Sequence, residues 1–292
     1  MYESYWQLAA RPFDHSADAR FYYPGPSQQA AMLKLRYVVE NRRGAAILAG
    51  EAGLGKTLVA QSLLRQLGES FRPRVHLVFP QMPAEQLLAY LADQLSNPIP
   101  TRSVSEGHTP TRSVSEGHTP PIDQSLRRIQ HSLTEGAQAG RHAVIVIDEA
   151  HLLRESRALE TIRLLLNFEH NAQPLATFLL VGQTGLALDV QRLPQLDERL
   201  AVKCLLSRLT LEETAAYLQH RLAAAGGKRP IFDASAAEEI FELTHGIPRR
   251  INRLCDLALL VGYGEELRTL GRGQIQSIYE ELIGATPTIA AA

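Results

Sequence analysis

The octapeptide GEAGLGKT, residues 50–57, most strongly limits what this chain can fold into. It fits the pattern G-x-x-x-x-G-K-[ST] and lies between the apolar run GAAILAG and the helix-like segment LVAQSLLRQL. A glycine-rich loop in this setting curls so that successive backbone N–H groups face one centre, and the helix N-terminus adds partial positive charge. The motif therefore predicts a nucleotide phosphate-binding loop, in which Lys56 reaches the β- and γ-phosphates and Thr57 places its hydroxyl on Mg²⁺.

A second motif, VIVIDEAH, supplies the carboxylates that such a loop requires. Its apolar residues predict a buried strand that delivers Asp148 and Glu149 to the carboxyl edge of a sheet, where open α/β sheets bind ligands. We expect Asp148 to hold Mg²⁺ together with Thr57, and Glu149 to polarise the attacking water. His151 is expected to be a hydrogen-bonded turn residue, with a coupling element as the alternative. The residues expected to contact the nucleotide from the loop are Gly50, Glu51, Ala52, Gly53, Leu54, Gly55, Lys56, Thr57 and Leu58.

Three further polar residues are candidates for the same site. Gln183 follows the apolar run ATFLLVG, where it could sense the γ-phosphate or orient water. Arg199 lies far along the α/β region and could reach a neighbour's nucleotide in trans, with a solvated surface arginine as the alternative. Arg249 begins a helix in HGIPRRINRL and could fold over the phosphates, with a simple basic helix face as the alternative.

The letters DEAH also occur in helicases, but this chain does not fit that class. Such helicases need two P-loop-type domains, and only one nucleotide-binding core fits here, followed by helices.

Short apolar runs alternate with helix-like segments up to about residue 208. Strands without a polar face that alternate with helices indicate a parallel sheet covered on both sides, an α/β fold. A helix is expected from Ser27 onward. The predicted strands are 45–49, 74–79, the run within HAVIVIDEAHLL, 176–181 and, as a fifth, 202–206; the predicted helices are 84–95, 123–140 and the segment LETIRLLLNF.

Only helical patterns follow Leu209. The segments TLEE (210–213) and SAAE (235–238) have capping-box spacing, Gly246 can end a helix and Pro248 can begin the next. We therefore expect an N-terminal segment that packs on the nucleotide core, a P-loop domain, a helical lid domain and a frayed tail. The expected bounds are 1–41, 42–208, 209–284 and 285–292.

The decapeptide TRSVSEGHTP occurs twice without a difference, at 101–120. Each copy has one valine and no aromatic residue, so it cannot bury enough apolar surface to offset the entropy of ordering. A solenoid needs at least three repeats. A binding or modification loop is the alternative, but we expect a disordered insertion that is tolerated because lengthening a loop costs little.

Composition and charge place the chain among ordinary globular proteins. Hydrophobic residues make up 45% and charged residues 21%, and the net charge of -1 argues against a surface coated for nucleic acid. Cys204 and Cys255 form no CxxC pair, so a disulfide scaffold or zinc module is not expected. We see no signal peptide and no apolar window of about 18 residues, and we expect a cytoplasmic protein without direct membrane insertion.

The chain resembles an AAA+ ATPase and, more narrowly, the general secretion pathway protein A (ExeA/GspA) family. The resemblance rests on PFDHSADARFYYPGPSQQAAMLKL, GEAGLGKT, VIVIDEAHLL, LLVGQTGL and GIPRRINRLCDLALL, and covers Tyr5 to about Leu282 except the repeat. It implies an AAA+/ASCE P-loop NTPase with a three-layer α-β-α core and a small all-helical lid. It also implies ATP and Mg²⁺ as ligands, ATP hydrolysis as the activity, and self-association into a dimer or ring.

The resemblance also assigns roles to individual residues. In this family the N-terminal Pro-Phe segment packs near the adenine, which suggests Pro12, Phe13 and Tyr23 for the base pocket. Gln183 matches the sensor 1 position. The Gly-x-Pro-Arg pattern is the sensor 2 element, which places Pro248 and Arg249 at the nucleotide. The same core occurs in TniB/TnsC-type transposition ATPases, which bind DNA.

Three functions are compatible with the sequence. The first is an ATPase motor or switch with a protein partner in a secretion or envelope-assembly system. The second is a DNA-binding regulator of transposition type, whose DNA affinity would be sensitive to salt. The third is a scaffold that holds ATP without turning it over, which the intact P-loop and acidic pair argue against. The basic residues that favour DNA are Arg42, Arg43, Arg249, Arg250 and Arg253.

Overall fold

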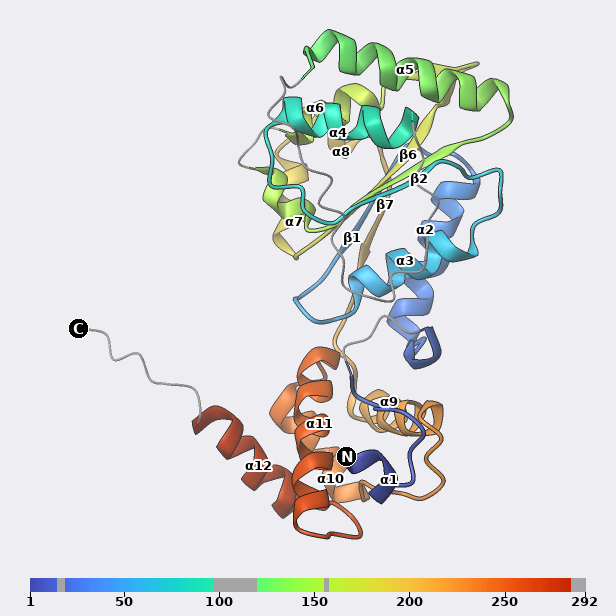
Figure 1. Cartoon of the computed structure of the whole chain (residues 1–292). Helices are drawn as coiled ribbons and strands as arrows, with labels where there is room; N and C mark the ends of the chain where they lie inside the picture. Colours follow the sequence, from blue (N-terminus) through green and yellow to red (C-terminus); the bar gives the residue numbers. More distant parts are fainter. Residues whose placement is uncertain (15–18, 97–119, 155–157, 285–292) are drawn as a thin grey trace, which may run out of the picture. The chain divides into compact units, whose positions relative to one another are not determined.

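A computed structural model describes residues 1–14, 19–96, 120–154 and 158–284 (Figure 1). The chain divides into two compact units, each with its own hydrophobic core. The sheet unit comprises Ser27–Ala52 and Lys56–Leu206, and the helical unit comprises Met1–Pro26, Gly53–Gly55 and Ser207 onward. The expected disordered insertion at 101–120, apart from Pro120, and the expected frayed tail at 285–292 lie outside the described residues.

Among the described residues, five parallel strands form the centre of the sheet unit, in the order β2-β3-β6-β1-β7. Every residue of β1, β3 and β6 is buried, as expected for strands covered on both faces. The predicted parallel sheet is confirmed, but β2 ends before Val78 and Phe79, which are exposed. The strands are Ala45–Ala49 (β1), Arg74–Leu77 (β2), Ala143–Ile147 (β3), Ala176–Gly182 (β6) and Leu200–Leu205 (β7).

Helices lie on both faces of this sheet, so the expected three-layer arrangement is confirmed (Figure 1). Strand residues such as Ile47 and Ile145 pack in one core with α4 to α8, and the intervening residues, such as Leu48, are buried on the other face, toward α2 and α3. A short hairpin, β4 and β5, precedes β6. The remaining bounds are Pro26–Glu40 (α2), Lys56–Gln66 (α3), Ala84–Ser96 (α4), Ile122–Gln138 (α5), Ala150–Arg154 (η2), Ala158–Leu165 (α6), Glu169–His170 (β4), Gln173–Pro174 (β5), Gly185–Gln191 (α7) and Pro194–Asp197 (α8).

Arg74 fixes the end of α3, the helix that begins at the GEAGLGKT loop. Its guanidinium donates to the carbonyl oxygens of Phe71 (2.8 Å), Leu64 (2.9 Å) and Gly68 (2.7 Å), and also to that of Leu67. A positive charge suits the carboxyl end of a helix, where carbonyl groups lack intrahelical partners. One side chain therefore ties the helix end to the first residue of β2.

Replacing Arg74 with alanine should lower the free energy of unfolding by roughly 3 kcal/mol, because four carbonyl groups lose a charged donor. Lysine should recover little of this, since one ammonium group cannot match a planar fork of donors. Urea unfolding followed by circular dichroism measures the effect. Arg72, in an exposed ion pair with Glu69, is the matched control and should cost less than about 1 kcal/mol. Equal losses at the two arginines would contradict this role for Arg74.

The helical unit is built from both ends of the chain. Trp6 is fully buried and donates from Nε1 to the carbonyl of Leu259 (2.9 Å), and a Cβ at Gly262 would come within 2.9 Å of its ring. Residues 1–26, the larger part of the segment 1–41, belong to the helical unit, where their aromatic side chains complete a core with later helices. That the segment 1–41 packs on the nucleotide core stays a prediction. The helices of this unit are Tyr2–Tyr5 (α1), Leu211–Ala224 (α9), Ala234–Thr244 (α10), Pro248–Gly264 (α11) and Arg272–Gly284 (α12), with a 3₁₀ turn at Ala19–Phe21 (η1).

Capping residues explain where these helices begin and end. The predicted capping box between Thr210 and Glu213 is confirmed. The one predicted at 235–238 is wrong, because Asp233 is the N-cap of α10 and accepts the N–H of Ala236. Gly246 follows α10 with φ +67°, and a Cβ there would lie 2.0 Å from the carbonyl oxygen of Leu209, so only glycine fits.

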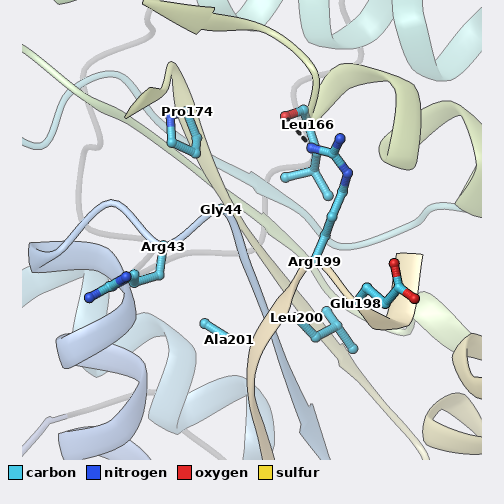
Figure 2. A pocket seen from close by; sticks show the side chains of 8 residues that line it. All are labelled: Arg43, Gly44, Leu166, Pro174, Glu198, Arg199, Leu200 and Ala201. Carbon is cyan, nitrogen blue, oxygen red and sulfur yellow. Dashed lines mark hydrogen bonds between the residues drawn. The ribbon is translucent and has the colours of Figure 1, made fainter. Parts of the chain in front are cut away.

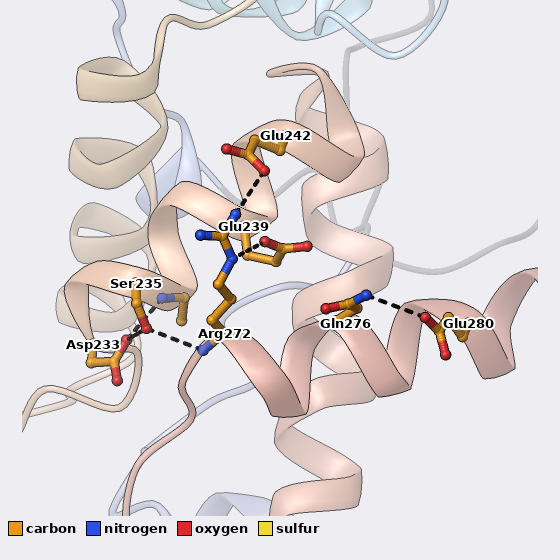
Figure 3. A network of polar contacts seen from close by, with 8 residues as sticks. Asp233, Ser235, Glu239, Glu242, Arg272, Gln276 and Glu280 are labelled. Carbon is orange, nitrogen blue, oxygen red and sulfur yellow. Dashed lines mark hydrogen bonds and ion pairs between the residues drawn. The ribbon is translucent and has the colours of Figure 1, made fainter.

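Arg272 joins α12 to α10 through the network in Figure 3. Its Nε donates to Glu239 (2.6 Å), its Nη2 to Glu242 (2.9 Å), and its backbone N–H to Ser235 Oγ (3.1 Å). Charge-assisted hydrogen bonds of this kind are stronger than those between neutral groups, and these tie the start of α12 to α10. In the part of the chain that the structure describes, no helix is both long and apolar enough to cross a bilayer.

Candidate nucleotide site

The carboxyl ends of β1, β3 and β6 bring three loops to one edge of the sheet. The register pairs Ala49 with Gly182 and Ile147 with Leu180, so the three strands end at similar positions along the strand direction. The backbone N–H of Gly50 donates to the carbonyl of Gly182 (3.3 Å). The GEAGLGKT loop, the acidic pair and Gln183 are therefore collected at the edge where open α/β sheets bind ligands.

The glycine-rich loop has the backbone that its sequence predicts. Gly53 and Gly55 have φ values of +88° and +89°, in the left-handed region that glycine adopts without strain. Lys56 begins α3 and is 7% exposed. Its Nζ donates to the carbonyls of Gly50 (2.9 Å) and Glu51 (2.8 Å), so it spans the loop from within. The positive charge and the N-terminus of α3 thus lie on the same loop, an arrangement suited to an anion.

Thr57 and Asp148 meet at the base of this loop. The Thr57 hydroxyl donates to Asp148 Oδ2 (2.6 Å), and the Glu149 N–H donates to Oδ1 (2.9 Å). Burial alone would raise the pKa of Asp148, but His76, Thr57 and the Glu149 N–H together hold that pKa below its ordinary value. His76 Nε2 lies 3.7 Å from Oδ2, too far for a hydrogen bond, so its influence is electrostatic. Asp148 is therefore a carboxylate at neutral pH.

The paired oxygens of Thr57 and Asp148 fit a magnesium ion. Magnesium prefers hard oxygen ligands and binds through one or two protein groups, with phosphate and water oxygens completing its shell. Within the described ranges, no group of three or more His, Cys, Asp or Glu side chains is placed to hold a metal ion. The hydroxyl of Thr57 and the carboxylate of Asp148 are hard oxygen donors, which is the ligand type that magnesium prefers.

Glu149 is presented differently from Asp148. Its backbone has φ +50°, an uncommon conformation for a non-glycine residue, and its side chain is 47% exposed. Strained backbone of this kind clusters at functional sites. His151 in η2 places Nδ1 3.4 Å from Glu149 Oε2, and that nitrogen has no hydrogen-bond partner in the part of the chain that the structure describes. The expectation that His151 is a hydrogen-bonded turn residue is not met at this atom.

Gln183 and Arg199 lie at opposite ends of the parallel strands, Gln183 at the carboxyl ends and Arg199 at the amino ends. Gln183 follows β6 and is exposed at the carboxyl edge, beside the loop after β3. Arg199 precedes β7 at the amino edge, where its Nη1 donates to the carbonyl of Leu166 (3.1 Å). A five-residue strand such as β1 separates the two edges by roughly 16 Å. Arg199 is therefore remote from the loop of its own chain.

A pocket of about 300 Å³ surrounds Arg199 at this amino edge (Figure 2). Arg43 and Glu198 also line it, but Figure 2 shows their charged groups pointing away from one another. The pocket lies at the amino ends of β1 and β7, whereas the GEAGLGKT loop follows the carboxyl end of β1.

Arg249 lies in the first turn of α11, directly after Pro248, and its side chain is exposed. Gly53–Gly55 belong to the same compact unit as this helix, and the Arg249 N–H donates to the carbonyl of Gly53 (3.3 Å). A Cβ at Gly53 would lie 2.8 Å from that of Arg249, so glycine is required at this approach. A role of the Arg249 guanidinium at the phosphates stays a prediction.

The residues suggested for the base pocket belong to the helical unit. Phe13 is 1% exposed and its ring lies edge-on to Phe232, while Tyr23 meets the rings of Tyr217 and His220. The Phe13 ring is thus enclosed by this core, and a role in stacking on a base stays a prediction.

Arg221, which the sequence reasoning missed, holds this N-terminal segment in place. Its guanidinium donates to the carbonyls of Pro12, Asp14 (2.9 Å) and Phe21 (3.3 Å), and it lies 4.8 Å from the centre of the Phe21 ring. Its only sequence signal was a charged residue on the apolar face of a helix.

Comparison with known proteins agrees with this architecture. A family model described as an AAA domain matches residues 39–188. General secretion pathway protein A from Aeromonas hydrophila is 29% identical over 287 residues, which is 97% of this chain. The resemblance to that family is confirmed, and the chain spans about half the length of this relative, 49%.

Solved structures share the fold at low sequence identity. An ORC2 protein from Aeropyrum pernix, in complexes with ADPNP and ADP, has a TM-score of 0.63 and 16% identity over 93% of this chain and 71% of its own. The Drosophila ORC bound to DNA has a TM-score of 0.65 and 16% identity over 95% of this chain and 66% of its own. The P-loop fold with a helical C-terminal part is therefore confirmed.

Proposed function

Because the chain belongs to the AAA domain family, we propose that it binds ATP and hydrolyses it to ADP and phosphate. The observation that carries the proposal is the contact between Thr57 and Asp148 at 2.6 Å, with Glu149 adjacent and half-exposed. The oxygens of Thr57 and Asp148 would bind the metal ion, and the separate carboxylate of Glu149 would be left to act on water. This is the division of roles that hydrolysis of a phosphoanhydride requires.

Binding depends on the loop and the first turn of α3. Backbone N–H groups of residues 50–58 surround the phosphates, and Lys56 turns its ammonium from the loop carbonyls toward the β- and γ-phosphates. Thr57 and Asp148 hold the magnesium ion. When bound, that ion neutralises charge on the β- and γ-phosphate oxygens.

The chemical step transfers one proton and breaks one bond. Glu149 accepts a proton from water, the water oxygen forms a bond to the γ-phosphorus, and the bond from that phosphorus to the bridging oxygen breaks. The electron pair of the broken bond leaves with ADP. Gln183, exposed at the same edge of the sheet, orients the water or senses the γ-phosphate.

Other residues complete the site in this proposal. Arg199 serves the nucleotide of a second copy, because it lies at the sheet edge remote from its own loop. This requires a dimer or ring. Arg249 and Pro248 act at the phosphates from α11. Pro12, Phe13 and Tyr23 form the wall of the base pocket, and the Phe13 ring supports that wall from within the core.

The biological role we favour is that of an assembly motor or switch in a secretion or envelope-assembly system, with a protein partner. Its support is the similarity along 97% of the chain to general secretion pathway protein A. A DNA-binding regulator of transposition type is the second candidate. It is favoured by Arg249, Arg250 and Arg253, which are all exposed on α11, and by the likeness to an ORC that binds DNA.

Steady-state phosphate release from ATP, measured with and without double-stranded DNA, tests the activity and separates the two roles. We expect turnover that DNA changes by less than about twofold at both 50 mM and 200 mM salt, since the favoured partner is a protein. Stimulation by DNA that is lost at the higher salt would contradict the secretion role and support the DNA-binding role. Absence of turnover in the wild-type chain would contradict the proposed activity.

A further inference from the structure

His151 approaches the carboxylate that the proposed reaction uses as a base. Glu149 and His151 are separated by one residue, and the left-handed backbone of Glu149 directs the chain into η2. The turn is closed by the Leu152 N–H, which donates to the Glu149 carbonyl (2.9 Å). As a result His151 Nδ1 lies 3.4 Å from Glu149 Oε2.

The histidine is held more firmly than the glutamate. A Cβ at Gly182 would lie 3.2 Å from the His151 backbone nitrogen, so η2 packs directly on the end of β6. Ala150 and Leu153, on either side of it, are buried in the core of the sheet unit. The His151 side chain is 20% exposed, against 47% for Glu149. His151 is therefore the fixed member of the pair, and Glu149 is the side chain with rotamer freedom to lose.

We propose that His151 is a positioning residue for Glu149. Its Nδ1–H donates to one carboxylate oxygen and leaves the other oxygen to take the proton from water. The buried Nδ1 has no hydrogen bond among the described residues, and a small rotation of the Glu149 side chain would supply one. This inference rests on the proposed hydrolysis. It adds that His151 selects the Glu149 rotamer that accepts the proton.

Three substitutions separate donation at Nδ1 from other properties of the ring. The amide nitrogen of asparagine superposes on imidazole Nδ1, and that of glutamine superposes on Nε2. His151→Ala and His151→Gln should lower kcat about tenfold with KM unchanged, and His151→Asn should stay within about twofold of wild type. His170, exposed on β4, is the matched control, and His170→Ala should not change kcat. Thermal unfolding confirms that each variant folds.

A double-mutant cycle with Glu149→Gln gives the decisive readout. If His151 acts through Glu149, His151→Ala should cost nothing further in the Glu149→Gln background, because the group that it positions is already gone. An equal loss of kcat in both backgrounds would overturn the proposal, as would a loss that asparagine does not restore or a change confined to KM. If the wild-type chain itself shows no turnover, the proposed hydrolysis fails, and this assignment fails with it.

Discussion

Replacing Lys56 with alanine is expected to weaken ATP binding by about a hundredfold or more, which corresponds to about 2.7 kcal/mol. The ammonium is 7% exposed and spans the loop between the carbonyls of Gly50 and Glu51, so its loss removes a charge and leaves the loop without its internal support. Charge-assisted contacts to phosphate are among the strongest a side chain can make. Isothermal titration with a non-hydrolysable ATP analogue measures the change.

Lys34→Ala is the control for this prediction. Lys34 is exposed on α2, so the substitution removes the same charge without touching the loop. Its affinity for the analogue should stay within about twofold of wild type, since long-range effects of one surface charge are screened by salt. An unchanged affinity in Lys56→Ala, with thermal unfolding also unchanged, would refute the assignment of the phosphate site.

Glu149→Gln is expected to bind ATP with wild-type affinity and to lower kcat by at least about a hundredfold. The amide keeps the size and one acceptor of the side chain but cannot take the proton from water, and general-base catalysis contributes factors of this size. Single-turnover hydrolysis and analogue titration, measured on the same preparation, separate the chemical step from binding.

Glu85→Gln provides the matching amide substitution on the exposed part of α4 and should leave both quantities unchanged. Normal turnover in Glu149→Gln would show that another group activates water. The two central predictions also differ from each other. Lys56→Ala should lose the complex, whereas Glu149→Gln should accumulate it.

Features that depend on neighbours in sequence could be predicted well. The apolar runs at 45–49 and 176–181 predicted β1 and most of β6, and the P-loop glycines at 53 and 55 have the left-handed backbone that the motif needs. The capping box at Thr210 was found because its partners lie three residues apart. In each case a local rule and the tertiary structure agree, which is why a motif can be assigned without coordinates.

Features that depend on distant partners could not be predicted. Nothing in the sequence near the aromatic N-terminus indicates that the Trp6 indole donates a hydrogen bond to the carbonyl of Leu259, far along the chain. Arg221 gave no sign that its partners would be backbone carbonyls near Pro12. The contact between His151 and Glu149 is local, yet it depends on a left-handed residue that the letters DEAH do not reveal. A motif specifies which residues occur, and tertiary packing decides which atoms meet.

The core that residues 1–26 share with the helices after Ser207 can form only after nearly the whole chain has been made. The N-terminal segment is made before the whole sheet unit, and the helices that bury Trp6 are made after it. Contacts this distant in sequence close late, whereas the sheet unit has all its strands once Leu205 has been added. Tyr2, Trp6 and Phe13 therefore cannot enter this core before its later helices have been made, and apolar side chains that are exposed during folding promote aggregation.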